Sequence, residues 1–266
     1  MTEVWAAGDA YERFMGRWSS LIAVRFVAWL AAGPGLSWLD VGCGTGALTG
    51  AVLRTADPAA VTGVDSAAGF VRTARDRTGA GTARFAVADA AHLPFPGPRF
   101  DLVASGLMLN FTPDPAAVVA ELARVTRPGR RIGGYVWDYA AGMAMLRHFW
   151  DAAVAVDPGA ARWDEGSRFP LCAPPALAAA WTGAGLTAVR TGALTVSLEF
   201  ADFDDLWEPF LGGQGPAPGY LVSLPAPHRD RIAAELRRRL PPGPGGAITV
   251  PARAWAVCGD RPATAG

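Results

Sequence analysis

A glycine-rich turn, Gly-Cys-Gly-Thr-Gly at residues 42–46, separates a short apolar run from a stretch with helical spacing. Glycine has no Cβ, so a ligand can approach the backbone closely at such a turn. The N-terminus of the helix that follows offers unpaired N–H groups. The turn therefore predicts the first strand–helix unit of an α/β sheet, with room for a ligand at its bend.

An acidic residue, Asp65, lies nineteen positions after Gly46, at the end of the next apolar run. A carboxylate at that place can accept hydrogen bonds from both hydroxyls of an adenosine ribose. Glycine-rich turns also occur merely to pack a strand on a helix, and Gly42, Gly44 and Ala47 satisfy the looser pattern of a dinucleotide site. From these residues alone, a packing turn, a dinucleotide site and another adenosine site all stay open.

The first half of the chain alternates between apolar runs and stretches with helical spacing. One predicted helix has its own boundary signals, with Asp114 placed as the N-cap and Pro115 at the first helical position. This alternation predicts a parallel sheet with helices on both faces. The predicted strands are residues 37–41, 60–64, 83–87, 100–105 and 131–137.

Helices are predicted on either side of this region. At the start, Asp9 and Glu12 have the spacing of a capping box, and a second helix is expected over residues 20–32. After Trp137 the chain is mainly helical, with two later strands expected. The predicted helices are 143–156, 174–181, 203–211 and 229–240, the strands 188–198 and 247–257, and the loops 212–219 and 241–246.

Composition limits the classes of partner. All 24 basic side chains are arginine, and they balance 24 acidic ones, so we expect neither nucleic acid nor a membrane surface to be bound by bulk charge. The three cysteines and three histidines are too scattered to predict a metal site or a disulfide framework. No signal-peptide pattern precedes the first helix, so a cytoplasmic protein acting on a small molecule is expected.

Residues 36–137 resemble the class I S-adenosylmethionine (SAM) dependent methyltransferases, in particular the ubiquinone/menaquinone methyltransferase-like branch called type 11. The turn with the preceding Asp40 is similar to motif I of that family, and Asp65 stands at its ribose-binding position. Farther along, Asp89 between two alanines and the run 100–103 are similar to the adenine-binding motif. The closing segments of the branch resemble residues 107–115 and 127–129.

The resemblance implies a doubly wound, Rossmann-like sheet of seven strands, mostly parallel with the last antiparallel. It implies one methyltransferase domain over 1–266, with an N-terminal helical cap at 1–35, a SAM-binding core at 36–137, and lid insertions with the last two strands at 138–266. SAM would be the cofactor and S-adenosylhomocysteine its product. The implied cofactor-binding residues are Tyr11, Arg17, Asp40, Gly42, Gly44, Gly46, Asp65, Ser66, Asp89, Ala90 and Ser105.

The substrate side departs from the family, because Asn110 and Phe111 lie where many relatives carry histidines after the fourth strand. We therefore consider other proton acceptors. Asp138 follows the fifth predicted strand and could take a proton, although it could instead cap the next helix. His148 could act as a base, although a structural histidine is the commoner outcome.

Six of the ten tryptophans lie in the second half, outside the cofactor motifs. With the long insertion after Trp137, they predict a lid over a sizeable apolar or aromatic methyl acceptor, or else ordinary core packing. Two further hypotheses are a SAM-binding protein of this fold that transfers no methyl group, and an NAD-dependent oxidoreductase. The oligomeric state is not predicted. The six tryptophans are Trp137, Trp150, Trp163, Trp181, Trp207 and Trp255.

Overall fold

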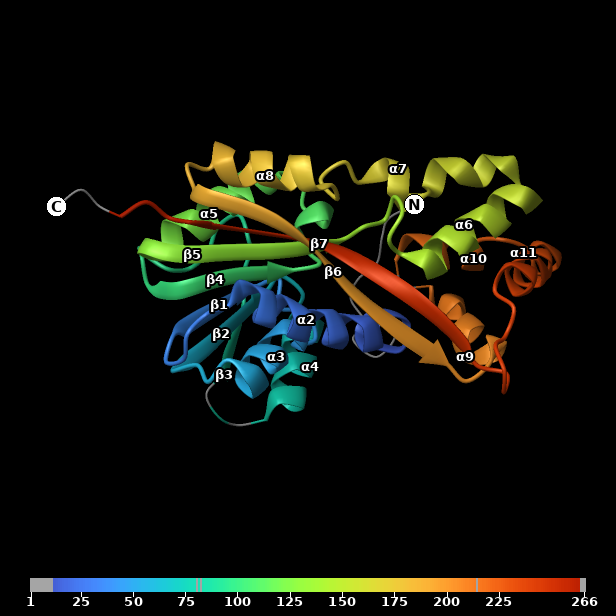
Figure 1. Cartoon of the computed structure of the whole chain (residues 1–266), viewed down its shortest axis with the longest axis horizontal. Helices are drawn as coiled ribbons and strands as arrows, with labels where there is room; N and C mark the ends of the chain where they lie inside the picture. The colour runs from blue at the N-terminus through green and yellow to red at the C-terminus, as the bar shows by residue number, and fades with distance from the viewer. Residues whose placement is uncertain (1–11, 80, 82, 214, 264–266) are drawn as a thin grey trace. The chain divides into compact units, whose positions relative to one another are not determined.

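The computed structural model describes residues 12–79, 81, 83–213 and 215–263 of the 266. They form a seven-stranded sheet in the order β3-β2-β1-β4-β5-β7-β6, mostly parallel with the last strands antiparallel, which confirms the predicted α/β sheet (Figure 1). The strands are β1 Ser37–Val41, β2 Ala60–Asp65, β3 Ala83–Val87, β4 Phe100–Gly106, β5 Thr126–Trp137, β6 Thr187–Phe200 and β7 Ile248–Asp260.

Helices occupy most of the remaining chain. The longer ones are α2 Arg17–Leu30, α3 Ala47–Thr55, α4 Ala68–Thr78, α5 Pro115–Val125, α6 Ala144–Val156, α8 Pro174–Gly183 and α11 Ala226–Arg239. The short ones are η1 Glu12–Gly16, η2 Leu109–Phe111, η3 Pro158–Trp163, α7 Glu165–Arg168, α9 Phe203–Trp207, η4 Glu208–Gly212 and α10 Pro216–Val222.

The helix boundaries follow the predicted signals in one case and depart from them in two. Asp114 caps α5, since its carboxylate accepts from the backbone N–H of Ala117 at 3.0 Å. Asp9 lies outside the described residues, and η1 leads directly into α2, so the predicted break before residue 20 is wrong. Residues 212–219 are not wholly a loop, because Pro216 starts α10, where a missing N–H costs no hydrogen bond.

The sheet is covered closely on both faces at β5. A Cβ added to Gly133 would lie 2.8 Å from Leu30 of α2, and one added to Gly134 would lie 2.9 Å from Trp181 of α8. The helices α2, α3 and α4 lie on one side of strands β1–β5, and α5 and α8 on the other (Figure 1). Two consecutive glycines therefore let both helix layers approach the same strand.

The chain packs as two compact units. The core unit comprises the described residues of Ser19–Val136 and Leu171–Leu194 with residues 254–263. The insertion unit comprises residues 12–18 with the described residues of Trp137–Pro170 and Thr195–Arg253. Helix α8 thus belongs to the core unit, although it follows the fifth strand in the chain.

Aromatic rings form the interior of the insertion unit. Phe210 stacks on Phe149 at 4.7 Å between ring centroids and meets Phe14 edge-on at 5.2 Å. Trp150 packs against Tyr220 at 5.4 Å and is 1% exposed. Trp150, one of the six tryptophans of the second half, is therefore an ordinary core residue.

Candidate functional site

The parallel strands bring several predicted site residues to one edge of the core unit, because β1, β2, β3 and β4 run in the same direction. The turn after β1 depends on glycine conformations: φ is +73° at Gly42, +52° at Gly44 and +88° at Gly46. Residues that carry a side chain rarely adopt such positive φ angles. Among the described residues nothing lies within 4 Å of a Cβ added to Gly44, so the turn has free space on its outer side.

Asp65 holds this turn from the neighbouring strand. One carboxylate oxygen accepts from the N–H of Gly44 at 2.9 Å, and the other from the N–H of Ala67 at 2.9 Å. Partial burial raises the pKa of this carboxyl. A carboxylate has about four acceptor sites, so Asp65 can still accept two hydroxyl groups. The structure therefore brings Asp65 and the glycine turn together.

Asp40 stabilises the turn through hydrogen bonds to the helix that follows it. It is 2% exposed, and one of its oxygens accepts from the backbone N–H of Thr49 at 3.0 Å and from its hydroxyl at 2.7 Å. Burial raises the pKa of Asp40 to about 7. Asp40 thus ties the end of β1 to the first turn of α3, which positions the backbone of Gly42 to Gly46.

The predicted adenine side is more open. Asp89 follows β3, and its carboxylate bonds the N–H of Ala91 at 2.9 Å and the ring of His92 at 3.0 Å. The hydrogen bond with His92 lowers the pKa of Asp89. The preceding residue, Ala88, donates its N–H to the carbonyl of Asp65 at 3.0 Å. Ala90 lies in the same bend, and Ser66 is exposed beside Asp65.

The end of β4 lies against the glycine turn. A Cβ on Gly42 would lie 2.5 Å from Cγ of Met108, so this side chain covers the start of the turn. Leu107 has φ +60°, a strained angle for a side chain of its size. The predicted residue Ser105 is fully buried, and among the described residues neither its hydroxyl nor the buried amide of Asn110 has a hydrogen-bond partner.

Of the two predicted methionine-binding residues, the structure describes Arg17, in the insertion unit. Tyr11 is outside the described residues. Arg17 donates to both oxygens of Asp205 at 3.2 Å and to the carbonyl of Glu199 at 2.7 Å. Its guanidinium also lies 5.2 Å from the ring centroid of Phe200. Binding of a ligand carboxylate by Arg17 would have to compete with Asp205.

Asp138 is engaged in the insertion unit. Its carboxylate accepts from Nε of Arg253 at 2.8 Å and from the N–H of Ala141 at 3.1 Å. It does not cap α6, whose N-cap is Met143, because the four turn residues 139–142 intervene. His148, the other candidate base, is half-buried on α6.

Glu165 is a buried carboxyl that the sequence analysis missed. It is 2% exposed and accepts a hydrogen bond from the indole N–H of Trp150. Burial raises its pKa to about 7. Its neighbour Asp164 pairs with Arg147. Nothing in the local pattern separates these two adjacent acids, so only the tertiary structure distinguishes the buried one.

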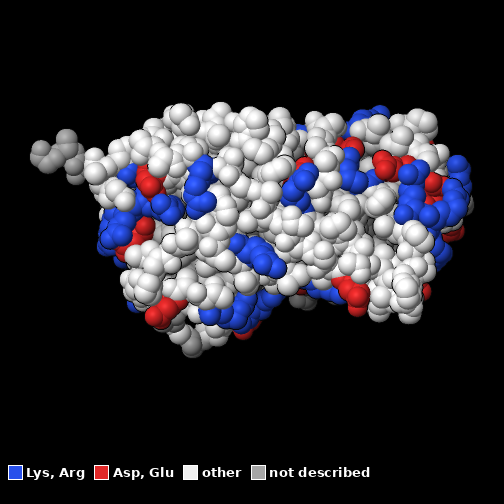
Figure 2. Space-filling view, viewed as in Figure 1, with Lys and Arg blue, Asp and Glu red and all other residues white. Residues whose placement is uncertain are grey.

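The surface carries both signs of charge. On the face shown in Figure 2, arginine and acidic side chains lie interspersed. Within the described ranges, no helix combines the length and apolar character that crossing a bilayer requires. The three cysteines, Cys43, Cys172 and Cys258, are buried, and no disulfide joins any of them within the part of the chain that the structure describes.

Comparison with known proteins finds a similarity over the segment that contains the glycine turn and Asp65. A family model described as a methyltransferase domain matches residues 39–132. Nocamycin O-methyltransferase of Saccharothrix syringae is 39% identical over 116 residues, 42% of this chain and 41% of that protein. A ubiquinone/menaquinone biosynthesis C-methyltransferase of Desulfotalea psychrophila is 35% identical over 108 residues, 40% of this chain and 44% of that one. The chain thus spans less than half the length of these two relatives.

Solved structures share the fold over most of the chain. The YcgJ protein of Bacillus subtilis has a TM-score of 0.59 at 18% identity and covers 90% of this chain and 98% of its own. The [4+2]-cyclase SpnF has a TM-score of 0.50 at 22% identity and covers 93% of this chain and 81% of its own. A protein named for a cyclase activity therefore shares the fold of this chain.

Proposed function

We propose that this chain, which carries a class I SAM-dependent methyltransferase domain of the type 11 branch over residues 39–132, transfers a methyl group from SAM to a small molecule. One observation carries the proposal: Asp65 bonds the glycine turn at Gly44 and keeps acceptor capacity beside the free space there. The residues fit the cofactor, since glycine N–H groups and a carboxylate suit its amino-acid end and its ribose.

The roles of the chain's own residues follow from this arrangement. SAM supplies an electrophilic methyl group, so the protein mainly has to position the acceptor and exclude water. Asp65 would accept the ribose hydroxyls, Asp89 the adenine amino group, and Gly44 and Gly46 would allow close approach. Asp40 would act as a positioning residue, because its oxygen is bonded to Thr49.

For proton removal we favour His148 over Asp138. The carboxylate of Asp138 is already bonded to Arg253 and Ala141. The ring of His148 is half-buried on α6, with no described side chain hydrogen-bonded to it. We further propose an apolar or aromatic acceptor, as the tryptophan-rich second half of the sequence predicts. We also propose a cytoplasmic location, as the scattered cysteines of the sequence predict.

A second candidate is a SAM-binding protein of this fold that transfers no methyl group. The likeness to the structure named as a [4+2]-cyclase favours it, because fold alone does not fix the chemistry. Incubation with SAM and a panel of phenols, quinols and carboxylic acids tests the choice by mass spectrometry. We expect S-adenosylhomocysteine and a methylated product with at least one acceptor. Tight SAM binding without product across broader panels would favour the second candidate.

A further inference from the structure

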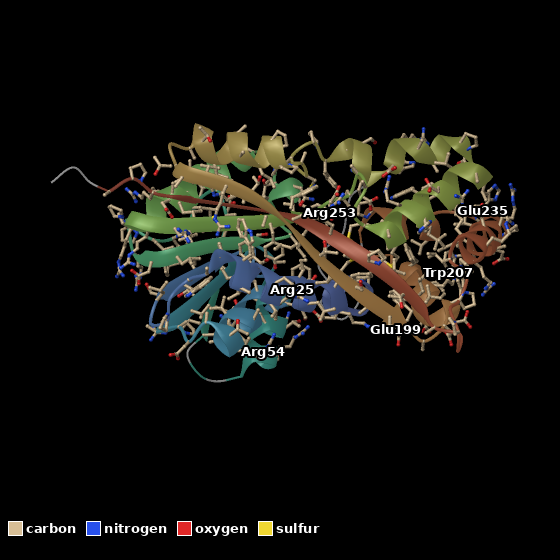
Figure 3. All side chains as sticks on the ribbon, in the orientation of Figure 1. Arg25, Arg54, Glu199, Trp207, Glu235 and Arg253 are labelled. Atoms are coloured by element: carbon tan, nitrogen blue, oxygen red, sulfur yellow. The ribbon has the colours of Figure 1, made fainter. Side chains whose placement is uncertain are left out.

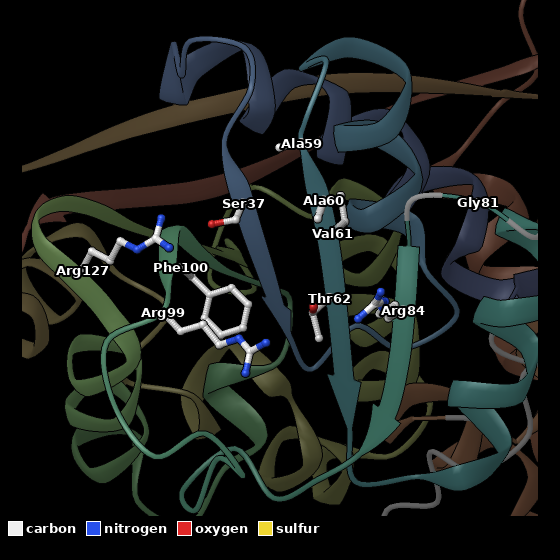
Figure 4. A pocket seen from close by; sticks show the side chains of 10 residues that line it. All are labelled: Ser37, Ala59, Ala60, Val61, Thr62, Gly81, Arg84, Arg99, Phe100 and Arg127. Carbon is white, nitrogen blue, oxygen red and sulfur yellow. The ribbon is translucent and has the colours of Figure 1, made fainter.

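A hollow of about 380 Å³ lies at the edge of the core unit opposite the glycine turn. It is formed where β1, β2 and β4 begin, at Ser37, Ala60 and Phe100 (Figure 4). Strand β1 extends from there to Val41, so about 13 Å of strand separates the hollow from the turn at ~3.3 Å per residue. Its volume is within the range of small-ligand sites.

The hollow is on a part of the sheet that no crossover helix covers. Residues 88–99, which connect β3 to β4, contain no helix. Thr62 and Arg84 are paired in register, so their side chains leave the same face of the sheet. The side chain of Asp40 points to the face that α3 covers, because it bonds Thr49 of that helix. Its neighbour Leu39 points to the opposite face, and Thr62 points the same way because it is in register with Leu39. Thr62 and Arg84 therefore project away from α3.

Three arginines from separate elements line this hollow: Arg84 of β3, Arg99 before β4 and Arg127 of β5. Figure 4 shows Arg84 beside Thr62 and Arg99 beside the ring of Phe100. Phe100 is itself buried and packs edge-on against Phe95 at 4.9 Å. The hollow thus combines an apolar wall with cationic side chains.

The positive charge is only partly balanced. Asp101 accepts from Arg127 at 2.8 Å and lies 3.5 Å from Arg130, so one carboxylate serves two guanidinium groups. Burial opposes its ionisation, but hydrogen bonds from Ser37 and Arg127 lower the pKa of Asp101 to about 2. Among the described residues, no carboxylate forms a salt bridge with Arg84 or Arg99.

We propose that this hollow binds a small phosphorylated molecule, whose phosphate is held by Arg84 and Arg99, while Arg127 adds positive charge to the lining. Guanidinium groups bind phosphate through paired N–H donors, and a doubly charged phosphate matches an excess of arginines better than a single carboxylate does. The proposal does not depend on the methyl-transfer chemistry, because the site lies at the other end of the strands.

The test is calorimetric titration at 0.15 M salt with inorganic pyrophosphate, uridine diphosphate and phosphate-free uridine. We expect saturable binding of one or both phosphates and none of uridine. If uridine diphosphate binds more tightly than pyrophosphate, the apolar wall contacts the organic group. If the two bind equally, the hollow recognises the phosphate alone. The double variant R84A/R99A should bind at least tenfold more weakly.

The matched control is R25A/R54A, which removes two exposed arginines from α2 and α3 (labelled in Figure 3). It should bind both phosphates as the parent protein does, and all three proteins should bind S-adenosylhomocysteine equally. No saturation by either phosphate, an equal loss in both double variants, or binding of heparin alone would overturn the proposal. Failure of the parent protein to bind S-adenosylhomocysteine would instead count against the proposed function.

Discussion

The carboxylates at the glycine turn of the core unit and those that follow β5 in the insertion unit have different partners. In the core unit, Asp40 and Asp65 accept hydrogen bonds from backbone N–H groups of the glycine turn and the helix after it. In the insertion unit, Asp138 and Asp164 pair with arginines (Arg253 is labelled in Figure 3). Carboxylates bonded to backbone can still accept ligand hydroxyls, whereas those paired with arginine are neutralised.

This difference assigns distinct roles to the units. The core unit shapes a turn around free space, so changes there should alter ligand binding more than folding. The insertion unit fixes its turns and short helices through ion pairs, so changes there should alter folding more than cofactor binding. Glu165 is the exception, since Trp150 rather than an arginine is its partner.

Gly44→Val should abolish SAM binding, with at least a hundredfold loss of affinity. The added side chain would enter the free space at the turn, while the positive φ costs about 1–2 kcal/mol of stability. Gly35→Val is the matched control, because Gly35 has φ +72° and nothing described within 4 Å of an added Cβ. Calorimetry measures SAM binding by both variants, and thermal unfolding measures their stability. Equal binding by both variants would remove Gly44 from the site.

Asp138→Ala should lower the free energy of unfolding by about 2–4 kcal/mol, because it removes the buried partner of Arg253 and the acceptor for Ala141. Its affinity for SAM should stay within twofold of the parent. Urea unfolding and a SAM titration measure the two quantities. Unchanged stability together with loss of turnover would restore Asp138 as a catalytic base.

Asp65→Ala should weaken SAM binding by about 1–3 kcal/mol, the cost of leaving buried hydroxyls unpaired. Asp114→Ala is a suitable control, since it removes the cap of α5 and should cost stability alone. A dissociation constant unchanged in Asp65→Ala, measured by calorimetry, would contradict the ribose assignment.

Glu165→Gln should change how stability depends on pH. Burial raises the pKa of Glu165 from 4.5 to about 7 in the folded protein, so its stabilising contribution is complete below about pH 4.5 and lost as pH rises to about 7. Glutamine still accepts from Trp150, so this variant should gain on the order of 1–3 kcal/mol over the parent at pH 8. Exposed Glu199→Gln is the control. Parallel pH profiles would refute the assignment.

Asn110→Leu should have the smallest effect, an increase of up to about 1 kcal/mol in unfolding free energy, since it removes a buried amide that lacks a partner. Such a gain in stability is expected where a polar group is kept for a ligand. Thermal unfolding with and without S-adenosylhomocysteine measures it. A clear loss of stability would mean that the amide supports the fold.

Sequence reasoning succeeded where the signal is local. The glycine turn, the cap at Asp114 and the five apolar runs depend on neighbouring residues. The first four strands end within one residue of their predicted ends, whereas β5 begins at Thr126, five residues before its predicted start. It failed at α10, where glycine and proline indicated a loop, although Pro216 starts a helix. Sequence reasoning also could not predict which charged side chains form ion pairs with residues far away in the chain.

The pair of Asp138 with Arg253 spans 115 positions, and no local pattern selects it. The burial of Glu165 next to half-exposed Asp164 likewise depends on the packing of α6 and α7. For the same reason Arg17, chosen for its chemistry, is found bonded to Asp205. Local spacing predicts which residues meet at the ends of neighbouring parallel strands, but not how a long insertion pairs its charges.

Titration of the purified protein with S-adenosylhomocysteine and, in parallel, with NAD tests most directly whether the turn at Gly44 and the carboxylate of Asp65 hold an adenosyl amino acid. Saturable heat with the first compound, displaced by SAM, and none with NAD is the predicted result. Binding of NAD alone, or no saturation with either compound, would contradict it.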